Sequence, residues 1–155
     1  MRKKITSTTI AAIFLCMFSP ILYSQTTSLI FFPFSAAAEQ VEQAEMLEDL
    51  LRVELINSNR IVLIDRNMVD RTLAGLGVYD AETGADEEQL KTAARQLDTD
   101  LYLTGHVGQI ENTSVVTLEL TSVGRSVSLY TNSHNLGESL RRDARQLGGE
   151  IIDAV

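Results

Sequence analysis

The spacing of hydrophobic residues changes along this chain, and each change predicts a different element. Leu29–Phe34 is an apolar run typical of a strand, and Pro33 limits it because proline cannot donate a ladder hydrogen bond. Apolar residues then recur every three or four positions from about Glu39 to Asn57, which predicts a helix buried on one side. The glutamates of this segment are expected to cover much of its opposite side: Glu39, Glu42, Glu45 and Glu48.

The segment Arg60–Arg66, Arg-Ile-Val-Leu-Ile-Asp-Arg, places four consecutive apolar residues between charged ones. Such a run, mostly β-branched, is typical of a short strand buried on both faces. Because helical patterns precede and follow it, we expect Ile61–Ile64 to be an inner strand of an α/β sheet. Asp65 then caps the following helix, which Gly75 and Gly77 end.

A polar loop follows, and Asp86 with Gln89 resembles a capping box that opens another helix. From Leu101 the period shortens to two, which predicts three consecutive strands. The last and weakest of these strands covers Val127–Thr131, and His134 lies in a polar turn after it. A final helix is expected to begin near Asn135, with an inner face formed by Leu136, Leu140, Ala144, Leu147 and Ile151.

The predicted element order is therefore β-α-β-α-α-β-β-β-α, a mixed β-sheet with helices packed on it. This order belongs to the α/β class and borders on α+β, because the last three strands follow one another without a helix between them. The residues from 25 to 155 have the length of one ordinary domain.

The N-terminus predicts export. Arg2, Lys3 and Lys4 precede the apolar stretch Ile10–Phe18, and the small residue Ser24 follows, which is the pattern of a secretory signal peptide. Its apolar core is far shorter than the roughly 20 residues that span a bilayer, although a retained anchor is the alternative. We expect residues 1–24 to be removed and the remaining domain to be periplasmic.

Cys16 is the single cysteine of the chain. Leu15 before it is not the small residue that a lipoprotein signal requires, so we expect Cys16 to leave with the signal peptide. The exported chain would then hold no disulfide, no thiolate metal site and no thiol nucleophile.

Charge narrows the choice of partners. The chain carries 13 basic and 21 acidic residues, a net charge of −8, and loss of the three N-terminal basic residues would make it about −11. An acidic domain repels phosphate backbones, so nucleic acid is not an expected partner, whereas basic protein surfaces are compatible.

Several segments together resemble a known family. They are Phe32-Pro-Phe34, Leu50–Leu55 (Leu-Leu-Arg-Val-Glu-Leu), Arg60–Arg66, and Leu97–Val107 (Leu-Asp-Thr-Asp-Leu-Tyr-Leu-Thr-Gly-His-Val). The set resembles the periplasmic domain of the curli assembly and transport component CsgG. It is equally similar to lipoprotein activators of penicillin-binding proteins and to the N-terminal domain of TolB, which share the fold.

The resemblance covers nearly the whole exported chain, and it implies an envelope domain that binds other proteins. Two departures argue against a secretion pore. The lipoprotein signal fails at Leu15, and the chain has no spare length for membrane barrel strands of roughly 9–11 residues each. The resemblance therefore implies an accessory domain whose partner is a cell-envelope protein or a second copy of itself.

Three residues are candidates for a special role: Asp65, Arg66 and His106. Asp65 and Arg66 follow a strand, where α/β sheets often place their sites, but a helix cap with a local ion pair is the simpler explanation because such caps are common. His106 is a candidate for pH sensing or ligand binding, or else a packed histidine.

Acidic residues suggest an alternative, a ligand- or ion-sensing domain that uses His106 or the acidic loop Asp80–Glu88. The loop does not fit the EF-hand spacing, because Gly84 stands fifth and not sixth from Asp80. Asp98 and Asp100 are either a carboxylate pair or the end of one helix and the start of the next strand. We find no catalytic motif, expect no cofactor, and predict a non-enzymatic domain. Free strand edges near Pro33 or at Val127–Thr131 are candidates for strand pairing with a partner.

Overall fold

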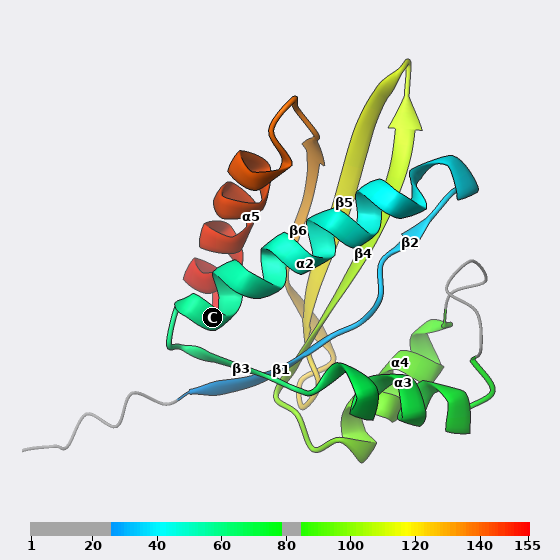
Figure 1. Cartoon of the computed structure of the whole chain (residues 1–155). Coiled ribbons are helices and arrows are strands. Elements are labelled where there is room, and N and C mark those ends of the chain that lie inside the picture. The colour runs from blue at the N-terminus through cyan, green and yellow to red at the C-terminus, as the bar shows by residue number, and fades with distance from the viewer. Residues whose placement is uncertain (1–25, 79–84) are drawn as a thin grey trace, which may run out of the picture.

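A six-stranded mixed sheet organises the domain (Figure 1). The structure is a computed structural model that describes residues 26–78 and 85–155. The predicted signal peptide with Cys16, and Asp80 and Glu82 of the acidic loop, lie outside these residues. Among the helices of the described residues, none has the length and apolar composition needed to cross a membrane.

The strands are β1 (Thr27–Phe31), β2 (Ser35–Ala36), β3 (Ile61–Leu63), β4 (Leu101–Ile110), β5 (Thr113–Ser122) and β6 (Val127–Asn135). The helices are the 3₁₀ turn η1 (Ala38–Gln40), α2 (Val41–Asn57), α3 (Arg66–Gly75), α4 (Glu87–Gln96) and α5 (Leu140–Ala154). The predicted α/β class and the predicted order of nine main elements are confirmed, with the short β2 and η1 added.

The sheet joins a parallel half to an antiparallel half. Its order is β3-β1-β4-β5-β6, in which β1 runs parallel to both of its neighbours and β4, β5 and β6 form an antiparallel meander. The chain leaves the sheet at Pro33, after β1, and pairs again with β4 as the short strand β2. There Ser35 pairs with His106 of β4. Proline has no N–H to donate, so the ladder is interrupted where the sequence predicted.

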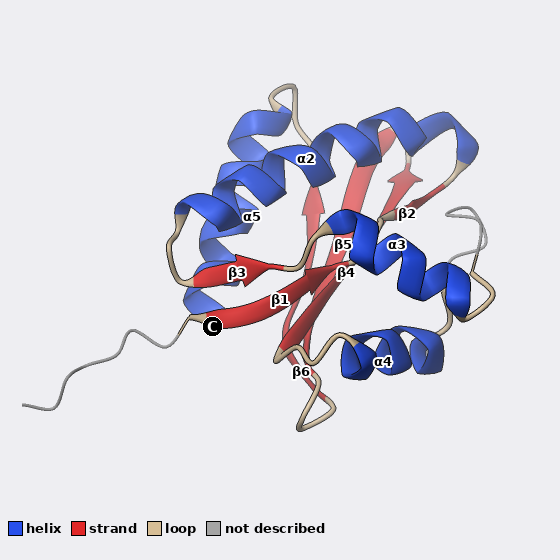
Figure 2. Ribbon diagram, turned by 60° about the horizontal axis from the view of Figure 1, so that its bottom comes forward, coloured by secondary structure: helices blue, strands red, loops and turns tan. Residues whose placement is uncertain are grey.

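Helices cover the two faces of the sheet unequally. Helices α2 and α5 pack on one face, over inward residues of β1, β4 and β5 such as Leu29, Leu103 and Leu118. Helices α3 and α4 pack on the other face, over Ile30 and Phe32 (Figure 2). Both faces of β1 are therefore buried, and its residues Leu29 to Phe31 together with the following Phe32 are at most 1% exposed.

The antiparallel half keeps one face in solvent. Alternate residues of β4, β5 and β6 point away from α2 and α5, and most of them are polar and at least partly exposed. We call this surface the open face and define it by Thr104, His106, Thr117, Glu119, Thr131 and Ser133. Alternation of apolar and polar residues in this half is the expected result of covering one face only.

The prediction that Ile61–Ile64 is an inner strand is wrong. Strand β3 is an edge strand of three residues, and Val62 is 51% exposed. Ile61 and Leu63 pack toward α2, whereas Ile64 packs against the α3 and α4 side. A short apolar run indicates that both sides of the chain are contacted, but it does not tell whether a second strand lies beside it.

The start of the last helix was also misplaced. Strand β6 continues to Asn135, and α5 begins only at Leu140 after the N-cap Ser139. Leu136 is buried, but its backbone N–H donates to Ser114 O next to the strand, so it is not helical. Asn132 and His134 of this strand contact carboxylates of α5, and Ser133 and Asn135 are exposed. Four polar residues in a row therefore resemble a turn in the sequence.

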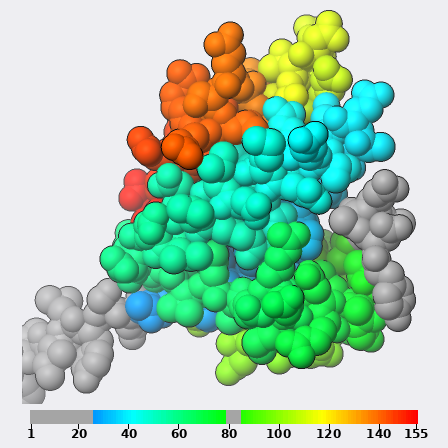
Figure 3. Space-filling model, in the orientation of Figure 1, coloured from blue at the N-terminus to red at the C-terminus, as the bar shows by residue number. Residues whose placement is uncertain are grey.

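Gly148 fixes how closely the two long helices pack. A Cβ atom at this position would lie 2.9 Å from Glu54 Cβ of α2, closer than real Cβ contacts, whereas position 149 has no neighbour within 4 Å. Helix α5 can therefore approach α2 closely at Gly148 because glycine has no side chain there. Figure 3 shows the two helices side by side, with the tip of the β4–β5 hairpin projecting beyond them.

These neighbouring glycines give a matched test of the packing. We expect Gly149→Ala to raise the free energy of unfolding by about 0.5–1 kcal/mol, because alanine favours helix at an open position. Gly148→Ala brings the same helix preference, but overpacking against Glu54 should lower stability by about 1–2 kcal/mol. Urea unfolding of both variants measures the difference, and equal effects would contradict the close approach of α2 and α5.

Candidate functional site

Asp65 is a helix cap, one of the two roles that the sequence allowed for it. Its Oδ1 accepts hydrogen bonds from the backbone N–H groups of Asn67 (3.0 Å) and Met68 (3.3 Å) at the start of α3. These N–H groups have no partner within the helix, so the carboxylate satisfies them. Asp65 follows an edge strand and not an inner one.

Arg66 extends toward α2, where it lies near the carboxylate of Glu48. Burial of Glu48 was not predicted from the sequence. Arg66 Nη1 lies 3.7 Å from Glu48 Oε1 and 3.9 Å from Asp49 Oδ1. Glu48 is only 2% exposed, although the helical pattern had placed it on the solvent side. Asp49 is largely exposed, so the contact with Glu48 is the structurally informative one.

Glu48 and Arg52 tie α2 to the end of β1. Arg52 Nε donates to Glu48 Oε1 at 3.1 Å, and Arg52 Nη2 donates to the carbonyl of Phe31 at 2.9 Å. The guanidinium also lies over the Phe31 ring, 4.6 Å from its centroid. The second oxygen of Glu48 accepts from the backbone N–H of Phe34 at 3.3 Å. Each charged group is thus paired and hydrogen-bonded, as burial requires.

His106 lies on the open face of β4 and contacts β2. Its Nδ1 is 2.9 Å from Ser35 Oγ, which is also 3.4 Å from the carbonyl of Gly105. Within the described part of the chain, no hydrogen bond or ion pair links His106 to Asp65 or Arg66. The three candidate residues therefore do not form one site, and any functional role for them stays a prediction.

The described part of the acidic loop has structural contacts. Asp86 and Gln89 form the predicted capping box of α4, with Gln89 N–H to Asp86 Oδ1 at 2.8 Å and Asp86 N–H to Gln89 Oε1 at 2.9 Å. Glu87 and Glu88 face Lys91, and the hydrogen bond with Glu87 raises the pKa of the Lys91 amine. No cluster of three possible metal ligands occurs among the described residues.

Asp100 is a clamp between β1 and β4 and not half of a carboxylate pair. Its Oδ2 accepts from Ser28 N–H (2.9 Å) and Ser28 Oγ–H (2.7 Å), and Ser28 Oγ accepts from Asp100 N–H (2.9 Å). These bonds favour the ionised form and lower the pKa of the Asp100 carboxyl. Asp98 follows the end of α4 and has a positive φ of 50°. This agrees with the prediction that Asp98 ends the helix.

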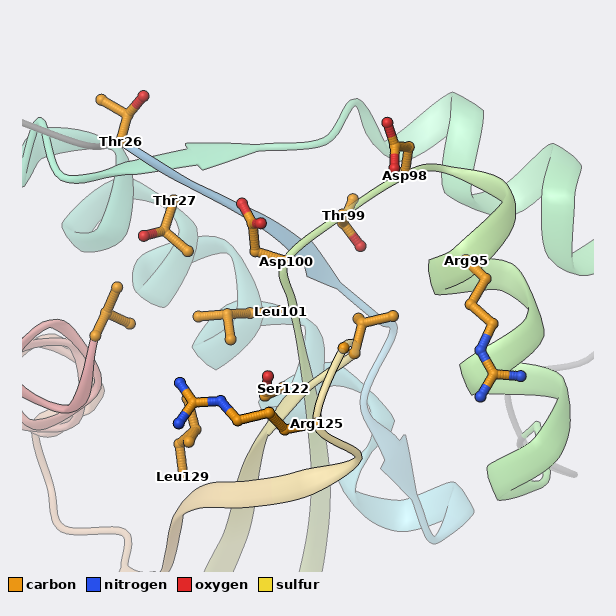
Figure 4. Close-up of a pocket in the computed structure, with 13 residues that line it drawn as sticks. Thr26, Thr27, Arg95, Asp98, Thr99, Asp100, Leu101, Ser122, Arg125 and Leu129 are labelled. Atoms are coloured by element: carbon orange, nitrogen blue, oxygen red, sulfur yellow. The ribbon is translucent and has the colours of Figure 1, made fainter.

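Two hollows adjoin the sheet. The larger one, of about 980 Å³, lies at the amino-terminal ends of β1 and β4, where Asp100 lies near Thr26 and Thr27 (Figure 4). Its cations, Arg95 of α4 and Arg125 of the β5–β6 turn, stand on separate walls. The smaller hollow, of about 480 Å³, lies between α4 and the open face and includes Lys91 and His106. Neither hollow concentrates charge of one sign.

His134 belongs to β6 and not to a solvated turn, so its predicted surroundings were wrong. Its Nε2 is buried and lies 3.5 Å from Asp143 Oδ1 of α5. Next to it, Glu150 accepts from Tyr130 Oη–H (2.6 Å) and Asn132 Nδ2–H (2.7 Å). Burial and this carboxylate raise the pKa of Tyr130 to about 12, while the bond from Tyr130 lowers the pKa of Glu150. This cluster binds α5 to β6.

Comparison with solved structures identifies the fold. The C-terminal domain of LpoB from Escherichia coli aligns with a TM-score of 0.62 at 12% identity, covering 82% of this chain and 94% of that one. Lipoprotein GNA1162 from Neisseria meningitidis aligns with a TM-score of 0.59 at 15% identity, covering 83% and 92%. TolB from Acinetobacter baumannii aligns at 0.60 and 15% identity over 84% of this chain but only 28% of TolB.

Comparison of the amino-acid sequence with known families and curated proteins does not identify a family. No protein-family model matches the chain, and no curated protein matches it. The expected likeness to the TolB fold is confirmed, and the chain shares a fold with LpoB and a bacterial lipoprotein. None of these findings supports the CsgG family in particular.

The buried pair predicts an asymmetric response to mutation in α2. Glu48→Ala should lower the free energy of unfolding by about 3 kcal/mol, because it leaves Arg52 without its carboxylate inside the protein. Asp49→Ala, one position along at a largely exposed site, should change stability by less than about 0.5 kcal/mol. Chemical denaturation tests both, and equal small effects would show that Glu48 is not a structural group.

The Ser28–Asp100 clamp predicts a pH dependence. A lowered folded pKa means that ionised Asp100 stabilises the fold above the unfolded pKa, near 3.8, and that this contribution is lost as pH falls through the folded value. Asp100→Asn should therefore cost about 1 kcal/mol at pH 7, a modest figure because the group is exposed. The difference from wild type should shrink as the pH falls from 3.8 through the lowered folded pKa of Asp100, and a constant difference across that range would contradict the clamp.

Proposed function

We propose that this chain is a non-enzymatic accessory domain of the bacterial cell envelope, which acts in the periplasm by contact with another envelope protein. The N-terminal pattern supports export, although it lies outside the described residues. The fold shared with LpoB and lipoprotein GNA1162 supports an envelope role. A finer role of the CsgG type in outer-membrane secretion or assembly rests on the residue-level resemblance alone.

The open face is the observation that carries this proposal. In the described part of the chain, helices leave one face of the outer part of β4, β5 and β6 uncovered. Polar side chains such as Thr117, Glu119 and Thr131 are exposed there. A flat polar surface framed by a rigid sheet suits a protein contact with a hydrogen-bonded rim. Its one acidic residue, Glu119, and the acidic chain as a whole favour a partner with basic groups.

Reactive side chains of the described residues are committed to structure. Asp65, Glu48 and Asp100 are held by a cap, an ion pair and a strand clamp. Ser35 and His106 form a single hydrogen bond, but no carboxylate of the described chain orients His106 through its other nitrogen. A nucleophile and base without an orienting group lack the arrangement that triad enzymes use.

Site-specific photo-crosslinking in the native envelope tests the proposal. A photoreactive residue at Thr117 of the open face should give a discrete adduct with an envelope protein, identified by mass spectrometry. The matched control is Val53, which is 54% exposed on α2 on the other side of the molecule. Equal adducts from both positions, or none from Thr117, would contradict the open face as the contact surface.

A thermal shift measurement separates this function from the sensing alternative. Ion sensing through Asp86–Glu88 predicts a rise in Tm with calcium, because binding to the folded state alone stabilises it. The accessory-domain proposal expects no calcium-dependent change, since these carboxylates already cap α4 and pair with Lys91. A saturable shift in Tm would favour the sensor.

A further inference from the structure

Among the described residues, no strand pairs with the outer side of β6, so a row of its backbone groups has no partner strand at this edge of the sheet. Strand β6 is paired on one side with β5 and ends the strand order. Leu136 N–H donates to Ser114 O, so by alternation the hydrogen-bonded pairs with β5 continue through His134 and Asn132. The N–H and C=O groups of Thr131, Ser133 and Asn135 therefore point outward, away from β5.

This edge carries none of the usual protection by charge. Residues 126–137 contain no Asp, Glu, Lys or Arg, although 34 of the 155 residues of the chain are charged. Natural edge strands are commonly guarded by lysine, proline or inward charges. Strand β6 has only a register irregularity opposite Leu120 and Thr121, well away from Ser133.

We propose that β6 pairs antiparallel with β6 of a second copy of this chain, about a twofold axis at Ser133. The outward groups are then self-complementary, because Ser133 meets its own copy and Thr131 meets Asn135 of the other chain. The two sheets become one, and the polar open faces of the two copies become continuous. The inference rests on the proposed function, since a domain that acts through protein contacts needs such a surface.

Helix α5 explains why the occupant is a second copy and not another strand. The helix lies along β6, to which Glu150 and Asp143 bind it (Figure 1). Arg142 in its first half and Asp153 in its second half are exposed. Arg145 instead lies 3.9 Å from Glu54 of α2, and Glu150 is held by β6. The twofold axis sets the two α5 helices antiparallel on one face, so the end of each helix that carries Arg142 lies opposite the end of the other that carries Asp153. Two acidic chains thereby meet where their charges are complementary.

Sedimentation velocity of the purified exported chain tests this pairing. Wild type should dimerise reversibly as concentration rises to about 100 µM, since association follows mass action. Ser133→Pro should abolish the dimer, because proline removes an outward N–H without touching the ladder to β5. Ser133→Ala, the matched control, keeps that N–H and should dimerise like wild type.

A second variant keeps the test decisive if proline disturbs folding. Arg142→Glu should weaken the dimer at least about threefold and reduce its sensitivity to salt between about 50 and 500 mM. A monomeric wild type, or a dimer unchanged by both Ser133→Pro and Arg142→Glu, would overturn the inference. That result leaves crosslinking from Thr117 unaffected, whereas loss of those crosslinks with the dimer intact would contradict the envelope-partner proposal instead.

Discussion

Glu48 holds a negative charge in the layer between α2 and the sheet, where an unpaired carboxylate would cost several kcal/mol. Arg52 compensates it and at the same time reaches the carbonyl of Phe31, so that α2 is locked to the end of β1. The same carboxylate accepts from Phe34 N–H just beyond Pro33. The chain can therefore leave the ladder at Pro33 and re-enter it as β2. This re-entry brings the Phe34 ring over Gly105, where no Cβ would fit, and sets Ser35 beside His106.

The two halves of the sheet then have different tasks. Parallel strands β1 and β3 need helices to connect them, and those helices bury β1 on both sides. The β4–β5–β6 meander needs only tight turns, such as Glu111–Asn112 with positive φ at both residues, so no connecting helix crosses its second face. The open face and the free edge of β6 are consequences of this connectivity.

Local signals in the sequence predicted the helices and strands well. They predicted less well which elements lie next to one another in the fold. The cap at Asp65, the capping box at Asp86 and the break at Pro33 depend on residues a few positions apart, and all three were foreseen. The edge position of β3 depends on which strand pairs with β1, and no pattern within Arg60–Arg66 records this. Burial of Glu48 depends likewise on Arg52 and Phe34, because helical spacing assigns a face but not a partner.

Strand β1 is buried on both faces and is the first strand of the sheet to be synthesised. Its partners come much later, because Thr27 pairs with Ile61 and Leu29 pairs with Leu101. The meander, by contrast, joins residues that are near in sequence and can form early. During synthesis the Leu-Ile-Phe-Phe segment therefore has no β4 partner until residues 101–110 have been made. This long separation in sequence exposes the apolar part of β1 to mispairing before the sheet is complete.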